Sequence, residues 1–127
     1  MPSTGLVNAR ALPPTPGPAR RALQSLLESN HWPGDVDSVV LAVHEALMNS
    51  VRHAGGPTSA AAVMEGPVLV VEVRDRGPGF DVDDQLRHPP DPMAERGRGL
   101  WLISQIAESW EVLHGEGQTT LRLRFRP

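Results

Sequence analysis

The stretch HEALMNSVRHA, residues 44–54, carries the pattern that decides the fold of this chain. Apolar residues recur through it, and through the residues before it, with the spacing of an α-helix. Asp35 is a typical N-cap residue, and two glycines and a proline after Ala54 end the predicted helix. Glu45 and Asn49 lie one turn apart on the same side of this helix. A carboxylate and a carboxamide in an apolar setting must each find a partner or face a cleft.

The predicted helix is apolar almost all round. One set of apolar residues falls within about 80° of helical arc and is expected to form the core stripe. This set comprises Val36, Val40, Val43, Leu47, Val51 and Ala54. Glu45 and Asn49 lie close to the opposite side, where Leu41 and Met48 flank them. We therefore expect both faces of the helix to be covered.

The composition is that of one soluble domain, covering residues 1–127, and it excludes several classes of protein. The net charge is −3 and there is no basic tract, which argues against a nucleic-acid binder. No apolar run is long enough to cross a membrane, and the N-terminus does not resemble a signal peptide. There is no cysteine, so a cytoplasmic location fits best. All twelve basic residues are arginine, so a Walker-type P-loop, which needs a lysine, is excluded.

The remaining segments predict an α+β two-layer sandwich, with helices on one face of a mostly antiparallel sheet. The expected strands are residues 6–12, 59–64, 68–74, 109–113 and 119–125, and the other expected helices are residues 19–29 and 97–107. Residues 13–18 (PPTPGP) are expected to form a rigid connection. Residues 81–95 are polar and proline-rich without periodicity, and they predict a loop of a length that is often functional.

Three short motifs contain residues suited to chemistry, and each also has a plain structural interpretation. Glu45 with Asn49 provides a general base and an oxygen ligand for Mg²⁺, or simply a solvated helix face. Asp75-x-Gly77-x-Gly79, at the end of a strand, aims an acid into a pocket or only forms a turn. The RGRGL sequence, residues 96–100, opens a helix whose free N–H groups suit a phosphate, although a glycine-rich loop end explains it equally well.

The order and spacing of these motifs resemble those of the GHKL ATPase superfamily, which has the Bergerat ATP-binding sandwich fold. Within it, residues 45–54 (EALMNSVRHA) look like the N-box of the RsbW-type anti-sigma factor serine/threonine kinases. Histidine-kinase ATPase domains are less similar, since their N-box usually carries asparagine where Glu45 stands. The resemblance covers nearly the whole chain.

The resemblance implies a role for each motif residue. Asn49 would bind the Mg²⁺ that bridges the ATP phosphates, and Glu45 would orient or deprotonate the attacking hydroxyl. Asp75 would accept a hydrogen bond from the adenine amino group, with the Thr120 hydroxyl beside it. The other implied nucleotide-binding residues are Gly77, Gly79, Gly97, Arg98, Gly99, Leu100 and Thr119. Arg96, and also Arg98, would reach the γ-phosphate and offset developing charge.

The resemblance also implies partners. A member of this family would phosphorylate an anti-anti-sigma (STAS-domain) protein, would alternatively bind a sigma factor, and would be a homodimer joined by its N-terminal part. Two residues depart from the family pattern: Gln118 replaces the glycine before the paired threonines, and Ser50 replaces an alanine. The first departure leaves the role of Thr119 open. It also leaves open the alternative of an ATP-sensing binding module without catalysis, and a fortuitous match in a non-nucleotide domain is the remaining possibility.

The last strand alternates apolar residues with Arg122, Arg124 and Arg126, as a half-buried strand should. These arginines are interpreted as a solvated face or as protection of a sheet edge. A docking site for an acidic partner is the alternative interpretation.

Overall fold

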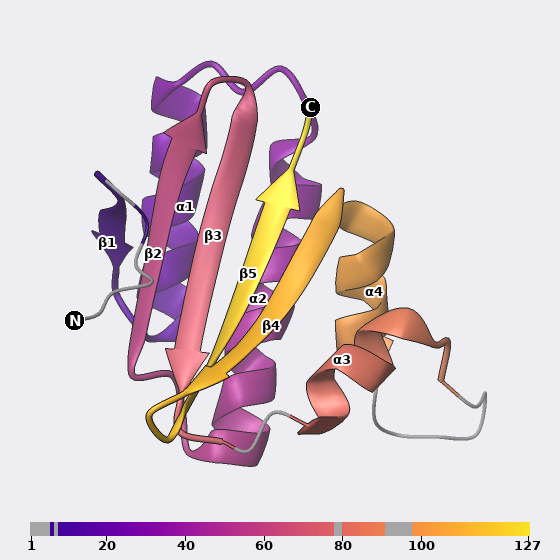
Figure 1. Cartoon of the computed structure of the whole chain (residues 1–127). Coiled ribbons are helices and arrows are strands. Elements are labelled where there is room, and N and C mark those ends of the chain that lie inside the picture. Colours follow the sequence, from indigo (N-terminus) through magenta and orange to yellow (C-terminus); the bar gives the residue numbers. More distant parts are fainter. Residues whose placement is uncertain (1–5, 7, 78–79, 91–97) are drawn as a thin grey trace.

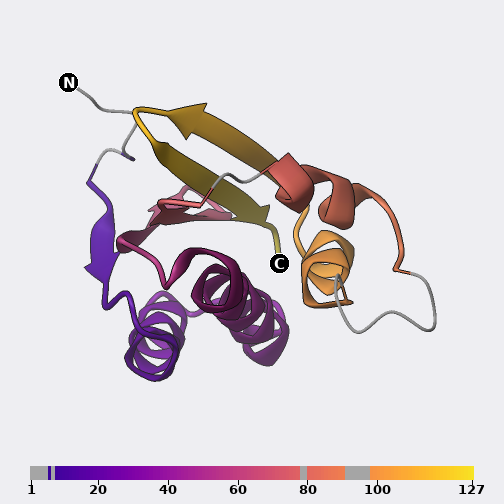
Figure 2. The same ribbon diagram turned by 90° about the horizontal axis from the view of Figure 1, so that it is seen from below.

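The structure is a computed structural model, and it describes residues 6, 8–77, 80–90 and 98–127. Its elements in chain order are β1 (Arg10–Leu12), α1 (Pro16–Ser29), α2 (Val36–Ala54), β2 (Ser59–Glu65), β3 (Val68–Asp75), α3 (Phe80–Arg87), α4 (Arg98–Ile106), β4 (Ser109–Gly115) and β5 (Gln118–Phe125). The strands form one sheet in the order β1-β2-β3-β5-β4, with antiparallel neighbours throughout. Helices α1, α2 and α4 lie on one side of the sheet (Figures 1 and 2). The predicted α+β two-layer sandwich is confirmed.

Local signals set the ends of the central helix α2 as predicted. The Asp35 carboxylate accepts hydrogen bonds from the amides of Asp37 and Ser38, and Gly55 ends the helix in the left-handed conformation. Hydrogen bonds from the Ser38 hydroxyl and amide lower the pKa of Asp35. Helix α1 begins earlier than predicted, because Pro16 occupies its first turn, where a missing N–H costs nothing.

The core lies between the sheet and the three helices. Strands β3 and β5 pair over their length, so the inward side chains of both strands form two rows facing α2. These rows hold Leu69, Val71 and Val73 on β3 and Leu121, Leu123 and Phe125 on β5. Leu23 and Leu27 of α1 and Val43 and Leu47 of α2 complete the same core. In the described part of the chain no helix is long and apolar enough to span a membrane.

The core stripe predicted on α2 is partly wrong. Val40, Val43 and Leu47 are buried, but Val51 is 43% exposed. Helix α2 lies between α1 and α4 (Figure 2), so its buried arc extends toward α4 and leaves the side of Val51 outside. The expectation that both faces of α2 are covered is also wrong, since Leu41 is 40% exposed.

The predicted loop at residues 81–95 is wrong in its first half. Residues Phe80–Arg87 form the short helix α3, whose Leu86 is buried in the core. The Arg87 guanidinium, 2.7 Å from Asp83, lowers the pKa of that carboxyl, and a hydrogen bond from Trp110 of β4 lowers it further. One buried leucine and these polar contacts therefore hold a segment that has little apolar periodicity of its own.

The outer face of the sheet, opposite the helices, carries paired charges rather than free arginines. Glu72 is 3% exposed and forms an ion pair with Arg122, whose Nε lies 2.6 Å from Glu72 Oε2. Arg124 pairs with Glu111 at 2.6 Å, and Arg126 pairs with Glu108 at 2.8 Å. The arginines in and just after β5 thus neutralise carboxylates on neighbouring strands and on the loop before β4.

Candidate functional site

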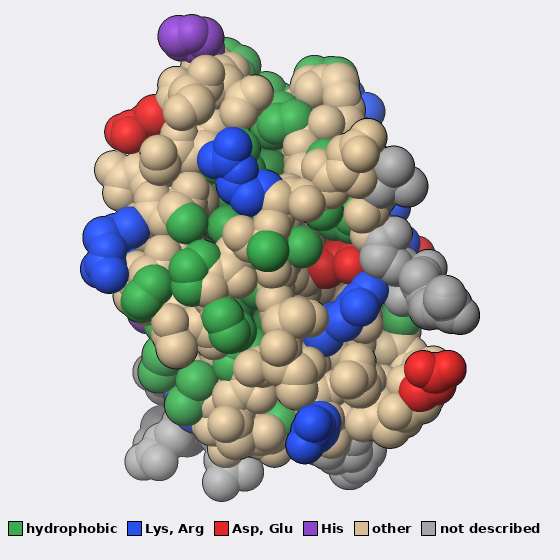
Figure 3. All heavy atoms as spheres, turned by 90° about the vertical axis from the view of Figure 1, so that its left-hand side faces the viewer, with side chains coloured by type: hydrophobic (Ala, Val, Ile, Leu, Met, Phe, Trp, Pro, Cys, Tyr) green, Lys and Arg blue, Asp and Glu red, His purple; other side chains and the backbone are tan. Residues whose placement is uncertain are grey.

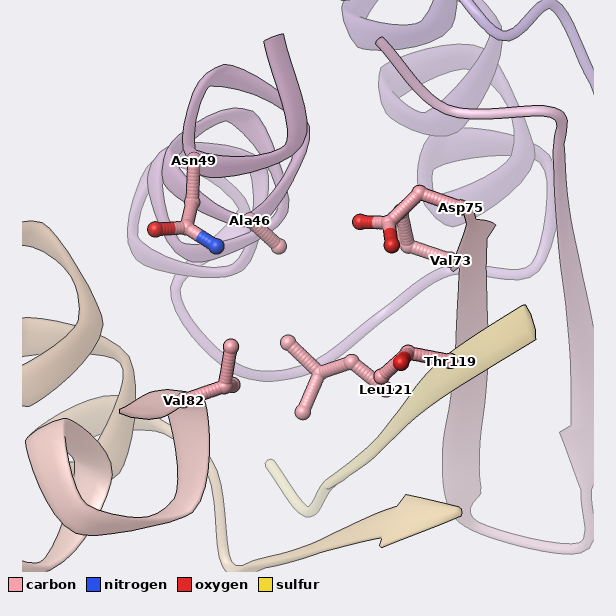
Figure 4. A pocket seen from close by; sticks show the side chains of 7 residues that line it. All are labelled: Ala46, Asn49, Val73, Asp75, Val82, Thr119 and Leu121. Carbon is pink, nitrogen blue, oxygen red and sulfur yellow. The ribbon is translucent and has the colours of Figure 1, made fainter. Parts of the chain in front are cut away.

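A pocket opens between α2, the C-terminal end of β3 and the N-terminal end of β5. Its lining comes from four elements: Ala46 and Asn49 of α2, Val73 and Asp75 of β3, Val82 of α3, and Thr119 and Leu121 of β5. Figure 4 shows the Asp75 carboxylate pointing into this space from β3, with the Asn49 amide across from it on α2. The pocket therefore has apolar walls with one carboxylate and one carboxamide facing each other.

A short hydrogen-bonded turn positions Asp75. Its Oδ1 accepts a hydrogen bond of 2.8 Å from the amide of Gly77. The carbonyl of the same Gly77 accepts a 2.7 Å hydrogen bond from the Thr119 hydroxyl. A Cβ at Gly77 would lie only 2.9 Å from the Cβ of Ala54, so this glycine also lets the turn pack on the end of α2. The Gly77 amide therefore holds the carboxylate, and Thr119 of the neighbouring strand holds the turn.

The sheet register decides which threonine belongs to the pocket. Thr119 pairs with Asp75, and Thr120 pairs with Arg74. Because side chains alternate along a strand, Thr119 shares the pocket side with Asp75 while Thr120 belongs to the outer face. We therefore assign to Thr119 the position beside Asp75 that the sequence analysis gave to Thr120.

The turn before Thr119 accounts for the departure at Gln118. Gly115 pairs with Gln118, which leaves Glu116 and Gly117 as a two-residue turn. Both residues have positive φ, 55° and 74°, as a tight hairpin of this kind requires. Gly117 supplies the needed glycine one position earlier than the family pattern, and Thr119 still faces the pocket.

Glu45 lies at the beginning of α4 rather than in the pocket lining. A Cβ at Gly99 would overlap Oε2 of Glu45 and would lie 3.2 Å from its Cδ. The Glu45 carboxylate thus rests against the first turn of α4, where the helix dipole and free N–H groups favour negative charge. Asn49, one turn further along α2, is 9% exposed and faces the pocket. Glu45 therefore contacts the first turn of α4, while Asn49 faces the pocket.

Among the other predicted site residues, one lies in the core and the rest lie wholly or partly outside the described structure. Leu100 is 3% exposed and belongs to the core, so its visible role is packing. Arg98 begins α4, but its side chain lies outside the described part of the structure. Gly79, Arg96 and Gly97 also lie outside the described residues.

Sequence reasoning missed several residues of the pocket. Val82 was missed because its segment was expected to be a loop, and the apolar Val73 and Leu121 were assigned to the core alone. His114 was also missed: it pairs with Thr119 across the hairpin, and its Nδ1 lies 3.4 Å from the Thr119 hydroxyl. Counting back from the Glu116–Gly117 turn would have found this pair.

The site fits a flat, largely apolar ring that carries an N–H donor. Apolar walls would cover the ring, and the Asp75 carboxylate would accept the hydrogen bond. A carboxamide oxygen such as that of Asn49 is a suitable ligand for Mg²⁺. Within the described residues no cluster of His, Asp or Glu side chains forms a metal site by itself, so a metal here would need ligands from a bound molecule and from water.

Comparison with known proteins agrees with this geometry. The family model described as histidine kinase-like ATPase domain matches residues 9–125. The serine-protein kinase RsbW of Bacillus cereus (strain ATCC 10987 / NRS 248) is 28% identical over 104 residues, which cover 72% of this chain. RsbW of Bacillus thuringiensis subsp. konkukian (strain 97-27) is 27% identical over 103 residues. The match spans 64% of the length of each of these relatives, a little under two thirds.

Proposed function

This chain belongs to the histidine kinase-like ATPase domain family, and from that premise we propose that it is an ATP-dependent serine/threonine protein kinase of the anti-sigma type. It binds ATP with Mg²⁺ and transfers the γ-phosphate to a STAS-domain anti-anti-sigma protein. In its other state it sequesters a sigma factor. The similarity to proteins named serine-protein kinase RsbW supports this choice within the family.

One observation carries the proposal: a carboxylate and a carboxamide face one pocket, and a second carboxylate lies beside that pocket at the start of α4. Asp75 stands at the base end of the pocket, Asn49 stands across from it, and Glu45 lies one turn before Asn49 against α4. A nucleotide needs recognition of its base, metal ligation at its phosphates and a base for the attacking hydroxyl. Asp75, Asn49 and Glu45 are residue types suited to these three tasks.

The residues of the chain divide this work. Asp75 accepts a hydrogen bond from the exocyclic amine of the adenine, and Thr119 keeps the Gly77 turn in place beside it. Asn49 would offer its oxygen to Mg²⁺, and the bound ion would neutralise phosphate charge. Glu45 accepts the proton of the acceptor hydroxyl, or fixes its direction. The N–H groups at the start of α4 lie next to Glu45 and suit the phosphates.

The Gln118 departure from the family pattern does not disturb this arrangement. Thr119 lies beside Asp75 through a regular two-residue turn. The alternative function, an ATP-sensing module that binds a partner without catalysis, shares the same pocket. It differs only in the use of Glu45, so the test must follow the phosphate rather than ATP binding.

The first experiment mixes the protein, Mg²⁺ and γ-labelled ATP with each STAS-domain protein of the same genome. We expect label on a serine or threonine of one of them. Glu45→Ala should keep the ATP affinity within about threefold and lose the transfer, because it removes the base and not the pocket. Glu28→Ala, on the exposed side of α1, is the matched control and should transfer normally. Bound ATP with no labelled protein would select the non-catalytic module instead.

We also propose that the chain forms a homodimer through its N-terminal part. Strand β1 is a sheet edge of three residues; Ala11 within it, and Pro13 and Pro14 after it, are exposed. Figure 3, in which the β1 edge faces the viewer, shows hydrophobic side chains over the middle of this face. Sedimentation at high protein concentration tests this, and a species of monomer mass alone would contradict it.

A further inference from the structure

The outer side of α2, turned away from the sheet, carries an apolar line. Leu41 and Val51 are 40% and 43% exposed, and they are the exposed large hydrophobic residues among those the structure describes. His44 and Met48, both half-buried, lie between them. Viewed along the helices, α1 and α4 flank α2 and no described element covers its outer side (Figure 2). We call the residues Leu41, His44, Met48 and Val51 the outer stripe.

The spacing of the outer stripe is that of a helix-packing seam. Its positions i, i+3, i+7 and i+10 are those at which one helix contacts another along a shallow crossing. Single exposed hydrophobic residues are ordinary on a protein surface. Here two exposed and one half-buried apolar side chains, with His44 among them, span about 15 Å of the helix, which is enough for three turns of a docked helix.

The outer stripe also has charges at its two ends. Asp37 lies one turn before Leu41 and is exposed, and Arg52 follows Val51 and is exposed. A helix that fits this surface would carry an apolar stripe, a basic residue facing Asp37 and an acidic residue facing Arg52. This pattern describes an amphipathic helix of a partner protein.

Its position next to Glu45 identifies the partner. Leu41 lies one turn before Glu45 and Met48 lies just under one turn after it. A protein that presents a hydroxyl to Glu45 approaches this part of the fold, and Leu41, one turn from Glu45, is an exposed large hydrophobic residue. We propose that the outer stripe is the docking surface for an amphipathic helix of the phosphoacceptor protein, an inference that rests on the kinase function proposed above.

The test uses the double variant Leu41→Gln, Val51→Gln in the full chain. Both side chains are exposed, so the fold should tolerate the change, and the thermal midpoint checks this. Leu113→Gln is the matched control, since Leu113 is a half-buried leucine on the outer face of β4, across the sheet from α2. Each protein is assayed with Mg²⁺, γ-labelled ATP and a concentration series of the STAS-domain protein that the wild type labels.

We expect KM for the acceptor protein to rise by about tenfold or more in the double variant, because both apolar side chains that contact the acceptor are replaced. Both kcat at saturating acceptor and the affinity for Mg·ATP should stay within about twofold of the wild type, because the reacting groups are untouched. The Leu113→Gln protein should keep the wild-type KM.

Two results would overturn the docking surface while leaving the kinase function intact. One is an unchanged KM for the acceptor in the double variant. The other is a change of sedimentation from dimer to monomer with KM unaltered, which would assign the outer stripe to a second copy of the chain. A wild-type protein that labels no acceptor would instead overturn the proposed function, and the docking inference with it.

Discussion

The carboxylate of Glu45 lies against Gly99, so closely that a methyl group on Gly99 would overlap Glu45 Oε2. Glu45 belongs to the middle of α2 and Gly99 to the first turn of α4, so only the packing of these two helices brings them together. An alanine at this place would push the carboxylate aside, because its Cβ would overlap Glu45 Oε2. The proposed transfer depends on this carboxylate.

Gly99→Ala should therefore lower phosphoryl transfer far more than ATP binding. Displacement of Glu45 by about 1 Å is expected to reduce the transfer rate on the order of a hundredfold. Single-turnover transfer from γ-labelled ATP measures this effect, with ATP affinity measured in parallel. Gly17→Ala is the control, since the nearest atom to its new Cβ would be Arg21 Nη1 at 3.8 Å. Transfer at the wild-type rate in Gly99→Ala would show that Glu45 need not be held there.

Thr119→Val and Thr120→Val should differ in their effect on ATP affinity, because the two threonines lie on opposite faces of β5. The Thr119 hydroxyl donates to the Gly77 carbonyl, so its loss loosens the turn that positions Asp75. We expect an ATP affinity about five- to tenfold weaker, the value of roughly one hydrogen bond. Titration calorimetry with Mg·ATP measures it. Thr120→Val changes the opposite face and should leave the affinity unaltered; equal losses in both variants would refute the assignment of Thr119.

Ser50→Ala should stabilise the protein. Ser50 is 1% exposed, and its Oγ has no hydrogen-bond partner among the described residues. Removal of a buried unpaired hydroxyl from a helix, together with the better helix propensity of alanine, should raise the free energy of unfolding by about 1 kcal/mol. Urea unfolding measures this. Ser104→Ala is the control and should not stabilise, because the Ser104 hydroxyl donates to the Trp101 carbonyl at 2.5 Å.

Glu111→Gln should remove a pH-dependent part of the stability. A hydrogen bond from Arg124, and the charges of Arg124 and Arg122, lower the pKa of Glu111 below 4.5. The folded state therefore favours the carboxylate, so this stabilisation is fully present above pH 4.5 and is lost as the pH falls through the lower folded pKa. The variant should melt below the wild type at pH 7 and approach it as the pH falls through the folded pKa. An undiminished difference in acid would contradict this, and Glu28→Gln serves as the control.

Much of the fold could be predicted because its signals are local. Asp35 caps the beginning of α2 and Gly55 caps its end, as expected. The β2–β3 and β4–β5 hairpins lie close to the predicted residues. Helix α3 could not be predicted, because what holds it is the burial of Leu86 and the contact of Asp83 with β4. Neither leaves a periodic pattern in the segment itself.

The candidate site was predictable in its residue types but not in its arrangement. Glu45, Asn49 and Asp75 stand out because polar groups in apolar elements need a reason. The exposure of Val51 was not predictable, because the orientation of α2 depends on the helices that flank it. The choice of Thr119 over Thr120 depended on a strand register, in which one residue of shift exchanges the two faces.

The sequence by itself determined the two ends of α2, the two hairpins and the residue types suited to chemistry. Caps, turns and apolar periodicity act over a few residues, so a linear reading contains them. Only the tertiary structure decided that Glu45 meets Gly99, that Asp75 pairs with Thr119, and that Leu41 and Val51 stay outside. These are relations between segments far apart along the chain. They follow from how helices and strands pack into one core, which no short stretch of sequence specifies.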